Sequence, residues 1–115
     1  MLAYISHEFG GELENVQRTE ELIKDLIKKY DQIQPVSPIH ATGFLYNEVS
    51  YEKGIDWCLN LLRFCDVMIV FGHESMSRGC IIEKEFCDEF NIPILDIDEF
   101  DEYYKRKIGD IDDES

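Results

Sequence analysis

The most constraining feature of the sequence is a run of five apolar residues, Val67 to Phe71, which follows Asp66 and ends at Gly72. Hydrophobicity in this run is continuous rather than alternating, which predicts a strand covered on both faces. Strands of that kind occur in parallel sheets, where crossover connections, usually helices, join successive strands. The run therefore predicts an α/β fold of the βαβ type.

The rest of the chain supplies the other elements of such a sheet. Short apolar runs predict strands at 2–6, 34–39 and 92–95, and helical spacing of apolar residues predicts helices at about 12–30, 50–64 and 80–90. Pro35 and Pro38 weaken the second strand, and a loop is expected at 40–47. We expect a small open parallel sheet, flavodoxin-like or Rossmann-like, of about four to five strands with helices on both faces.

Length and charge limit the classes of partner. The 115 residues fit one domain, which we place at 1–96, followed by an acidic C-terminal tail at 97–115 that forms a short helix and then frays. The formal net charge of −14 repels a polynucleotide backbone, so no nucleic-acid polymer is expected as a partner. The sequence shows neither a membrane span nor a signal peptide, so we expect a cytoplasmic protein that does not contact a membrane.

The four cysteines are Cys58, Cys65, Cys80 and Cys87. They form no CxxC motif and no cysteine–histidine cluster at zinc spacing. Buried reduced thiols are the favoured interpretation, with a disulfide or a metal site as the alternatives. We expect no metal site and no cofactor.

The helix predicted at 50–64 is apolar on two sides. Its main stripe runs from Tyr51 to Leu62, and Trp57 and Phe64 belong to a second apolar face. A helix of this kind needs two partners, which predicts a homo-oligomer, a dimer or larger, assembled through this helix. Asp56 lies on the polar strip that remains, where a solvated carboxylate is the ordinary interpretation.

In open parallel sheets, ligands bind beyond the carboxyl ends of the strands. This rule selects the loop at 6–12 after the first strand and the loop at 72–79 after the long strand. The candidate ligand-binding residues in these loops are Ser6, His7, Gly10, Gly11, His73, Ser75, Ser77, Arg78 and Gly79. For the histidines and Arg78, an ordinary surface position is the alternative.

Glu83 stands at the head of an otherwise apolar helical stripe that continues through Phe86, Cys87 and Phe90. Helical side chains lean toward the N-terminus, so its carboxylate is expected over the mouth of the 72–79 loop. The helix dipole would keep it ionised, while apolar neighbours would oppose ionisation. An ionised, partly desolvated carboxylate suits a nucleophile. The alternative is a first-turn glutamate that only satisfies the dipole.

The segment Ser77-Arg-Gly-Cys-Ile-Ile-Glu83 resembles the S-x-G-x-x-x-E signature of the nucleoside 2-deoxyribosyltransferase-like superfamily, and especially its small, often phage-encoded branch. This branch is related to the deoxynucleoside 5′-monophosphate N-glycosidases. Further matches follow in the same order: Tyr4-Ile5, Asn15-Val16, residues 35–40, Leu61-Leu62 with Cys65-Asp66, and Ile92-Pro93. The resemblance covers about residues 2–96.

This resemblance implies a mechanism. It assigns to Glu83 the attack on C1′ of a nucleoside, and to Ser75 and Ser77 contacts with the sugar or its 5′-phosphate. From its place in the first strand, and apart from the resemblance, Tyr4 is expected to reach the pocket and orient Glu83, with a core tyrosine as the alternative. Asp56 with Trp57 loosely matches the D-x-x-W of the hydrolase branch, which makes Asp56 a third catalytic candidate.

The function expected from these observations is cleavage or exchange of the N-glycosidic bond of a nucleoside or nucleoside 5′-monophosphate, the small molecule being the partner. A non-catalytic nucleotide-binding module, either a sensor or a sequestering protein, is the alternative. A structural subunit that assembles through its second helix is a third.

Overall fold

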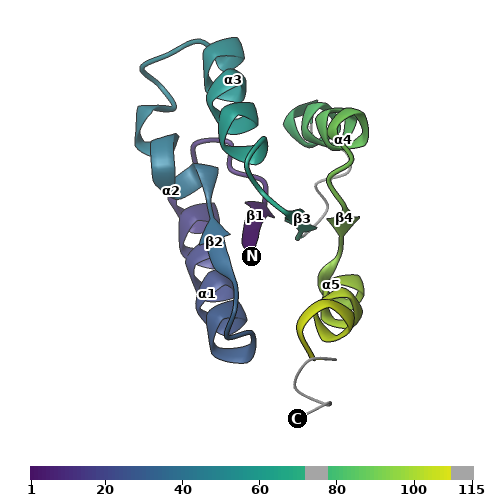
Figure 1. The fold of residues 1–115 in the computed structure, drawn as a ribbon. Coiled ribbons are helices and arrows are strands. Elements are labelled where there is room, and N and C mark those ends of the chain that lie inside the picture. The colour runs from purple at the N-terminus through teal and green to yellow at the C-terminus, as the bar shows by residue number, and fades with distance from the viewer. Residues whose placement is uncertain (72–77, 110–115) are drawn as a thin grey trace.

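The computed structural model describes residues 1–71 and 78–109. The elements in chain order are β1 (Leu2–Ser6), α1 (Leu13–Lys29), β2 (Gln34–Val36), α2 (Pro38–Thr42), the 3-10 turn η1 (Gly43–Leu45), α3 (Tyr51–Leu62), β3 (Val67–Val70), α4 (Arg78–Phe90), β4 (Ile94–Leu95), α5 (Ile97–Tyr104) and the π-helical turn η3 (Lys105–Gly109). Figure 1 shows their arrangement.

The four strands form one all-parallel sheet in the order β2-β1-β3-β4. Tyr4 in β1 pairs with Met68 in β3, and Ser6 pairs with Val70 at the carboxyl ends of the two strands. The chain leaves β1 toward one edge of the sheet and returns to build the other edge from β3, so the topological switch point lies between these strands. The predicted fold class is confirmed.

One face of the sheet packs against α1 and α5 (Figure 1). Ala3 and Ile5 of β1 lie on this face with Val67 and Ile69 of β3, because alternate side chains of a strand point to the same side. Leu26 of α1 and Phe100 of α5 complete a buried apolar cluster with them. Every buried member of this cluster except Tyr30 is a purely apolar side chain.

The opposite face packs against α3 and α4 (Figure 1). Tyr4 and Met68 point to this side, where they meet Leu62 of α3 and Cys87 of α4. Ser6 points the same way as Tyr4 and is buried, but it lies beyond the apolar cluster, at the end of the strand. This face therefore changes from apolar to polar along the strand direction.

The segment around Pro38 differs from the prediction. The strand expected at 34–39 ends at Val36, and the loop expected at 40–47 contains the end of α2 and all of η1. Ser37 caps α2 by accepting a hydrogen bond from the backbone N–H of His40 at 3.4 Å, and Pro38 occupies the first turn. Proline at that position lacks only an N–H that a helix start leaves unpaired, so Pro38 begins a helix.

The start of the segment predicted as an acidic tail contributes to the core. A reciprocal capping box between Asp96 and Glu99 begins α5. Phe100 is fully buried, its ring meeting that of Tyr30 edge to face at a centroid distance of 5.0 Å. The domain division at residue 96 stays a prediction, but α5 packs on the same sheet as α1.

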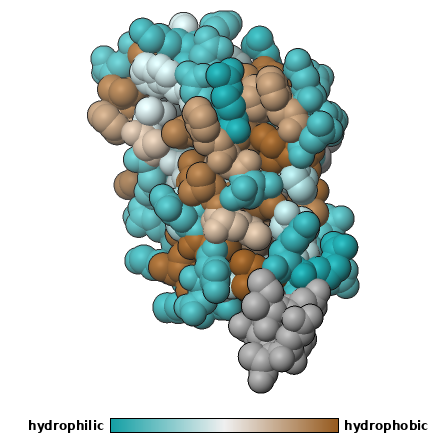
Figure 2. Space-filling model, viewed as in Figure 1, coloured by the Kyte–Doolittle hydropathy of each residue, from teal (hydrophilic) through white to brown (hydrophobic). Residues whose placement is uncertain are grey.

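The surface mixes charged and apolar side chains. In Figure 2, hydrophilic side chains cover the outer sides of the helices, and hydrophobic ones reach the surface in the upper and central parts of the view. Phe44 and Phe64 are the most exposed of the aromatic residues described, at 79% and 72%.

Within 1–71 and 78–109, every helix is too short or too polar to cross a membrane. Cys65, Cys80 and Cys87 are buried as predicted, whereas Cys58 is only partly buried.

Candidate functional site

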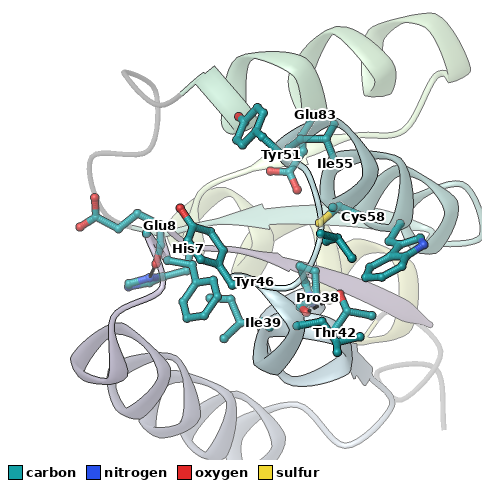
Figure 3. Close-up of a pocket in the computed structure, with 18 of the residues that line it drawn as sticks. His7, Glu8, Pro38, Ile39, Thr42, Tyr46, Tyr51, Ile55, Cys58 and Glu83 are labelled. Carbon is teal, nitrogen blue, oxygen red and sulfur yellow. Dashed lines mark hydrogen bonds between the residues drawn. The ribbon is translucent and has the colours of Figure 1, made fainter.

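A cavity of about 430 Å³ lies beyond the carboxyl end of β1. Its walls come from the loop after β1, from α2 and η1, and from the first halves of α3 and α4 (Figure 3). Its volume falls within the range of pockets that bind small molecules. The cavity occupies the edge of the sheet that the topology selects for a ligand.

Glu83 places a buried carboxylate in this cavity. The residue is only 7% exposed, and Figure 3 shows its carboxylate pointing into the hollow. The Tyr4 hydroxyl donates a hydrogen bond to Oε2, and the Ser6 hydroxyl donates one to Oε1 at 3.1 Å. Since Tyr4 and Ser6 are two residues apart in β1, both hydroxyls approach from the same face of the sheet. The two donors fix the carboxylate by both of its oxygens.

The electrostatic environment of Glu83 combines opposing effects. Burial raises the pKa of its carboxyl above the ordinary value of 4.5, while the hydrogen bonds from Tyr4 and then Ser6 lower it. Burial has the larger effect, so the pKa of Glu83 is raised. Desolvation therefore disfavours the ionised form of Glu83, and the two hydroxyl donors favour it.

The dipole of α4 contributes less to the ionisation of Glu83 than predicted. The described part of α4 starts at Arg78, so Glu83 lies in its second turn, and the first turn holds no acidic residue. The dipole acts mainly within the first turn. The interpretation of Glu83 as a first-turn residue that satisfies the dipole is therefore wrong, and the hydroxyls of β1 take the role expected of the dipole.

Tyr4 and Cys58 are the protonated neighbours of Glu83. Burial, and then the charge of Glu83, raise the pKa of the Tyr4 hydroxyl well above its ordinary value. Burial and the same charge raise the pKa of the Cys58 thiol to about 11. Both groups keep their protons at neutral pH. The predicted contact between Tyr4 and Glu83 is present.

Helix α3 turns a neutral surface toward the cavity. Gly54, Ile55, Trp57 and Cys58 line it, whereas Asp56 is exposed and is absent from the lining. Helical geometry separates Asp56 from its neighbours, because consecutive residues point about 100° apart around the axis. The structure therefore does not bring Asp56 together with Glu83, and a catalytic role for Asp56 stays a prediction.

The loop after β1 contributes His7, Glu8, Phe9 and Gly10 to the cavity. Gly11 lies outside the lining but shapes it, because its φ is +75° and a Cβ there would lie 2.8 Å from the Tyr46 ring. A left-handed φ and this close approach both require glycine. The Tyr46 ring also meets Phe9 edge to face, at a centroid distance of 5.1 Å.

The loop before α4 is only partly described. Gly79 lines the cavity, as predicted. Arg78 is exposed, and its guanidinium lies 4.9 Å from the centroid of the Tyr51 ring instead of lining the cavity. The predicted binding residues His73, Ser75 and Ser77 lie outside the described residues.

Sequence reasoning missed one wall of the cavity. α2, η1 and the turn after them supply the lining residues Pro38, Ile39, Thr42, Gly43, Leu45 and Tyr46. The pair Ser37-Pro38, an N-cap followed by proline, was the available signal for a helix start.

Among the residues described, no three His, Cys, Asp or Glu side chains lie close enough together to hold a metal ion.

Comparisons with known proteins give a structural relative. No model of a known protein family matches the chain, and no curated protein does. The structure is similar to that of a 2-desoxiribosyltransferase from Leishmania mexicana, with a TM-score of 0.60 at 15% sequence identity. The match covers 83% of this chain and 62% of the transferase, so the chain spans less than two thirds of that protein. The chain has a nucleoside 2-deoxyribosyltransferase-like fold.

Proposed function

We propose that this protein cleaves or exchanges the N-glycosidic bond of a nucleoside or nucleoside 5′-monophosphate, with Glu83 as the nucleophile. The observation that carries the proposal is the buried Glu83 carboxylate, which faces the cavity and is held by Tyr4 and Ser6 through both oxygens. A carboxylate fixed in this way is oriented before substrate arrives, which is what nucleophilic attack at a sugar carbon requires.

The chemistry is a double displacement. A Glu83 oxygen attacks C1′, the bond from C1′ to the base breaks, and a glycosyl-enzyme forms. Water or a second base then attacks C1′ and releases the carboxylate, as in retaining glycoside chemistry. The pKa of Glu83, which burial raises, makes its carboxylate more basic than an exposed one and so strengthens its attack.

The cavity walls suit a flat, weakly polar base. Phe9, Tyr46, Tyr51 and Trp57 contribute aromatic rings to the lining, and Ile39 and Ile55 contribute aliphatic surface. Aromatic side chains provide stacking surfaces for any nucleobase. Aromatic walls with a carboxylate at one end favour a nucleoside, the sugar lying against Glu83 and the base against the rings.

The test is a panel of nucleosides and nucleoside 5′-monophosphates incubated with the protein, with release of free base followed by chromatography. Glu83→Ala is expected to reduce the rate about 10⁴-fold or more, because a nucleophile has no substitute. Glu85→Ala is the matched control, since Glu85 is exposed on the same helix. Base release by the Glu83 variant at the wild-type rate, or no release across the panel, would refute the proposal.

A trapping experiment tests the covalent step directly. A nucleoside with fluorine at the 2′-position slows breakdown of the glycosyl-enzyme, so the protein mass should rise by that of one fluorinated sugar. Peptide mapping should place the added mass on Glu83. An adduct elsewhere would leave the site proposal intact but would reassign the nucleophile.

A non-catalytic nucleotide-binding module is the second candidate. The position of Asp56 favours it, because this carboxylate lies outside the cavity and is not placed to assist a leaving base. Such a module would show a higher melting temperature with a nucleotide that is then recovered intact. Nucleotide cleavage in the same tube would exclude this candidate.

Assembly into a homo-oligomer stays part of the proposal. Trp57 of the second apolar face of α3 lines the cavity, whereas Phe64, just after this helix, is 72% exposed. Exposed aromatic surface of this kind is common at subunit interfaces. Light scattering on the wild type and on Phe64→Ser would show whether this residue joins subunits.

A further inference from the structure

The leaving base requires a proton that α3 does not supply. In the proposed reaction the base departs with the electron pair of the C1′–N bond, and a neutral base is a poor leaving group unless it is protonated. The residues of α3 in the cavity wall include no carboxylate. The inference that follows rests on the proposed function and concerns the source of this proton.

Few side chains in the described cavity wall can carry a proton to the base. The titratable ones among them are His7, Glu8, Tyr46, Tyr51, Cys58, Cys80 and Glu83. Glu83 is the nucleophile, and Glu8 is exposed, with its carboxylate pointing away from the hollow in Figure 3. Burial raises the pKa of the Tyr51 hydroxyl and raises that of the Cys58 thiol to about 11, so both hold their protons too tightly for efficient transfer. Of the rest, imidazole is the group suited to transfer near neutral pH.

His7 is the first residue after β1 and directly follows Ser6, whose hydroxyl holds the Glu83 carboxylate. The side chain is partly buried, and it lines the cavity. Figure 3 shows His7 across the hollow from Ile55 and Cys58. A base seated in this hollow would have His7 in one of its walls.

The ring nitrogens of His7 have distinct roles. Nδ1 lies 2.8 Å from the backbone carbonyl oxygen of Glu8. A carbonyl only accepts hydrogen bonds, so Nδ1 carries a hydrogen in both the neutral and the charged ring. The proton that the ring gains or loses is therefore the one on Nε2. A hydrogen bond of this type fixes the tautomer and the orientation of a histidine.

We infer that His7 is the general acid that protonates the departing base through Nε2. As a Glu83 oxygen bonds to C1′, the C1′–N bond breaks, its electron pair moves to the base, and the Nε2 proton of charged His7 passes to a nitrogen or oxygen of that base. His7 is left neutral. In the second half-reaction, neutral His7 takes a proton from the attacking water or incoming base while the bond from Glu83 to C1′ breaks.

The test compares His7→Gln with wild type on two kinds of substrate. One is a nucleoside with a neutral base, supplied also as its 5′-monophosphate. The other is an N7-methylated guanine nucleoside, whose positively charged base leaves without a proton. His40→Gln is the matched control, because His40 bonds to Ser37 and Glu20 and is absent from the cavity wall. Melting temperatures confirm that each variant is folded.

His7→Gln should lower kcat for the neutral base about 100-fold, which is within the usual range for general acid catalysis, and should leave the methylated substrate nearly unaffected. His40→Gln should behave as wild type on both substrates.

Three results would overturn the assignment and leave the proposed function standing. The first is an equal loss on both substrates, and the second is a loss confined to the 5′-monophosphate, which would make His7 a phosphate ligand. The third is wild-type cleavage of the methylated substrate alone, since no acid would then be acting. Cleavage of neither substrate by wild type would remove the proposed function and this inference together.

Discussion

The two faces of the sheet have different roles, although the central strands β1 and β3 contribute side chains to both. On the α1–α5 face, Ala3 pairs with Val67 and Ile5 with Ile69, and apolar side chains fill the space up to Phe100. On the α3–α4 face, the intervening residues Tyr4 and Ser6 direct hydroxyls at Glu83. The face that is apolar throughout holds the fold, and the face that turns polar toward the strand ends forms the site.

This division has a physical cause in the alternation of strand side chains. A substitution in β1 affects one face only, because neighbouring residues point to opposite sides. Stability and chemistry can therefore change separately along a strand of five residues. The predictions below test whether the two faces are separable in this way.

The largest effect is expected from Phe100→Ala on the α1–α5 face. Phe100 is fully buried, so its removal should lower the free energy of unfolding by about 3–5 kcal/mol. Chemical denaturation measures this loss. At temperatures where the variant is folded, its kcat should match that of wild type, because Glu83 and its partners lie on the other face. A strong fall in kcat in the folded variant would show that the faces are coupled.

A smaller effect on stability is expected from Tyr4→Phe on the α3–α4 face. Loss of the hydroxyl leaves a buried carboxylate oxygen without its donor, at a cost of about 1–3 kcal/mol in unfolding free energy. The hydrogen bond from Tyr4 lowers the pKa of Glu83, so its loss should raise that pKa further. Activity needs the ionised carboxylate, so the low-pH limb of the rate profile should move to higher pH.

The control for Tyr4→Phe is Tyr30→Phe on the other face. Tyr30 donates a hydrogen bond to Asp101 at 2.6 Å, so this variant also loses one hydroxyl contact with a carboxylate, although a partly buried one. Its rate profile should keep the wild-type pH dependence. A shift of the low-pH limb in both variants would show that the pH effect does not arise at Glu83.

Glu83→Gln should alter how stability depends on pH. The folded-state pKa of Glu83 is raised, so its contribution to stability is full below about pH 4.5 and is lost as pH rises through the folded-state pKa. Gln cannot ionise, so the melting temperature of the variant relative to wild type should rise between pH 4 and pH 7. A difference that stays constant across this range would mean that burial does not disfavour the charge.

The smallest effect, of opposite sign, is expected from Asp101→Asn. The hydrogen bond from Tyr30, and then that from Lys105, lower the pKa of Asp101 from 3.8 to about 2. Its contribution is present above pH 3.8 and is lost as pH falls toward 2, so the variant should be slightly less stable than wild type near neutral pH and equal to it near pH 2. Salt should reduce the difference, because the ion pair with Lys105 is exposed.

The fold could be predicted largely from patterns that depend on burial. Val67 to Val70 and Leu2 to Ser6 are the two central strands, and buried parallel strands show continuous apolar runs. The α2 segment could not be recognised by periodicity, because a five-residue helix has too few residues to show a period. The wall of the cavity that it forms was missed for the same reason.

The site could be predicted in part. Glu83 stood out as a charge in an apolar stripe, and β-strand alternation alone places Tyr4 and Ser6 on one face. Sequence spacing could not show that the two hydroxyls meet both oxygens of Glu83, because that contact depends on how α4 crosses the sheet. Asp56 was a site candidate that the structure does not place in the cavity. Its neighbours Ile55 and Trp57 line the cavity, but each residue of a helix is turned by about 100° from the next, so Asp56 points elsewhere.

The packing of α5 affects the order in which the two faces of the sheet fold during synthesis. Phe100 closes a cluster whose other members, Ala3 to Ile69, leave the ribosome well before it. Until α5 emerges, α1 covers this side of the nascent sheet only in part, and the remaining apolar surface is exposed to chaperones. The polar side, with Glu83, can assemble earlier, so a newly made chain would acquire its cavity before it acquires its full resistance to unfolding.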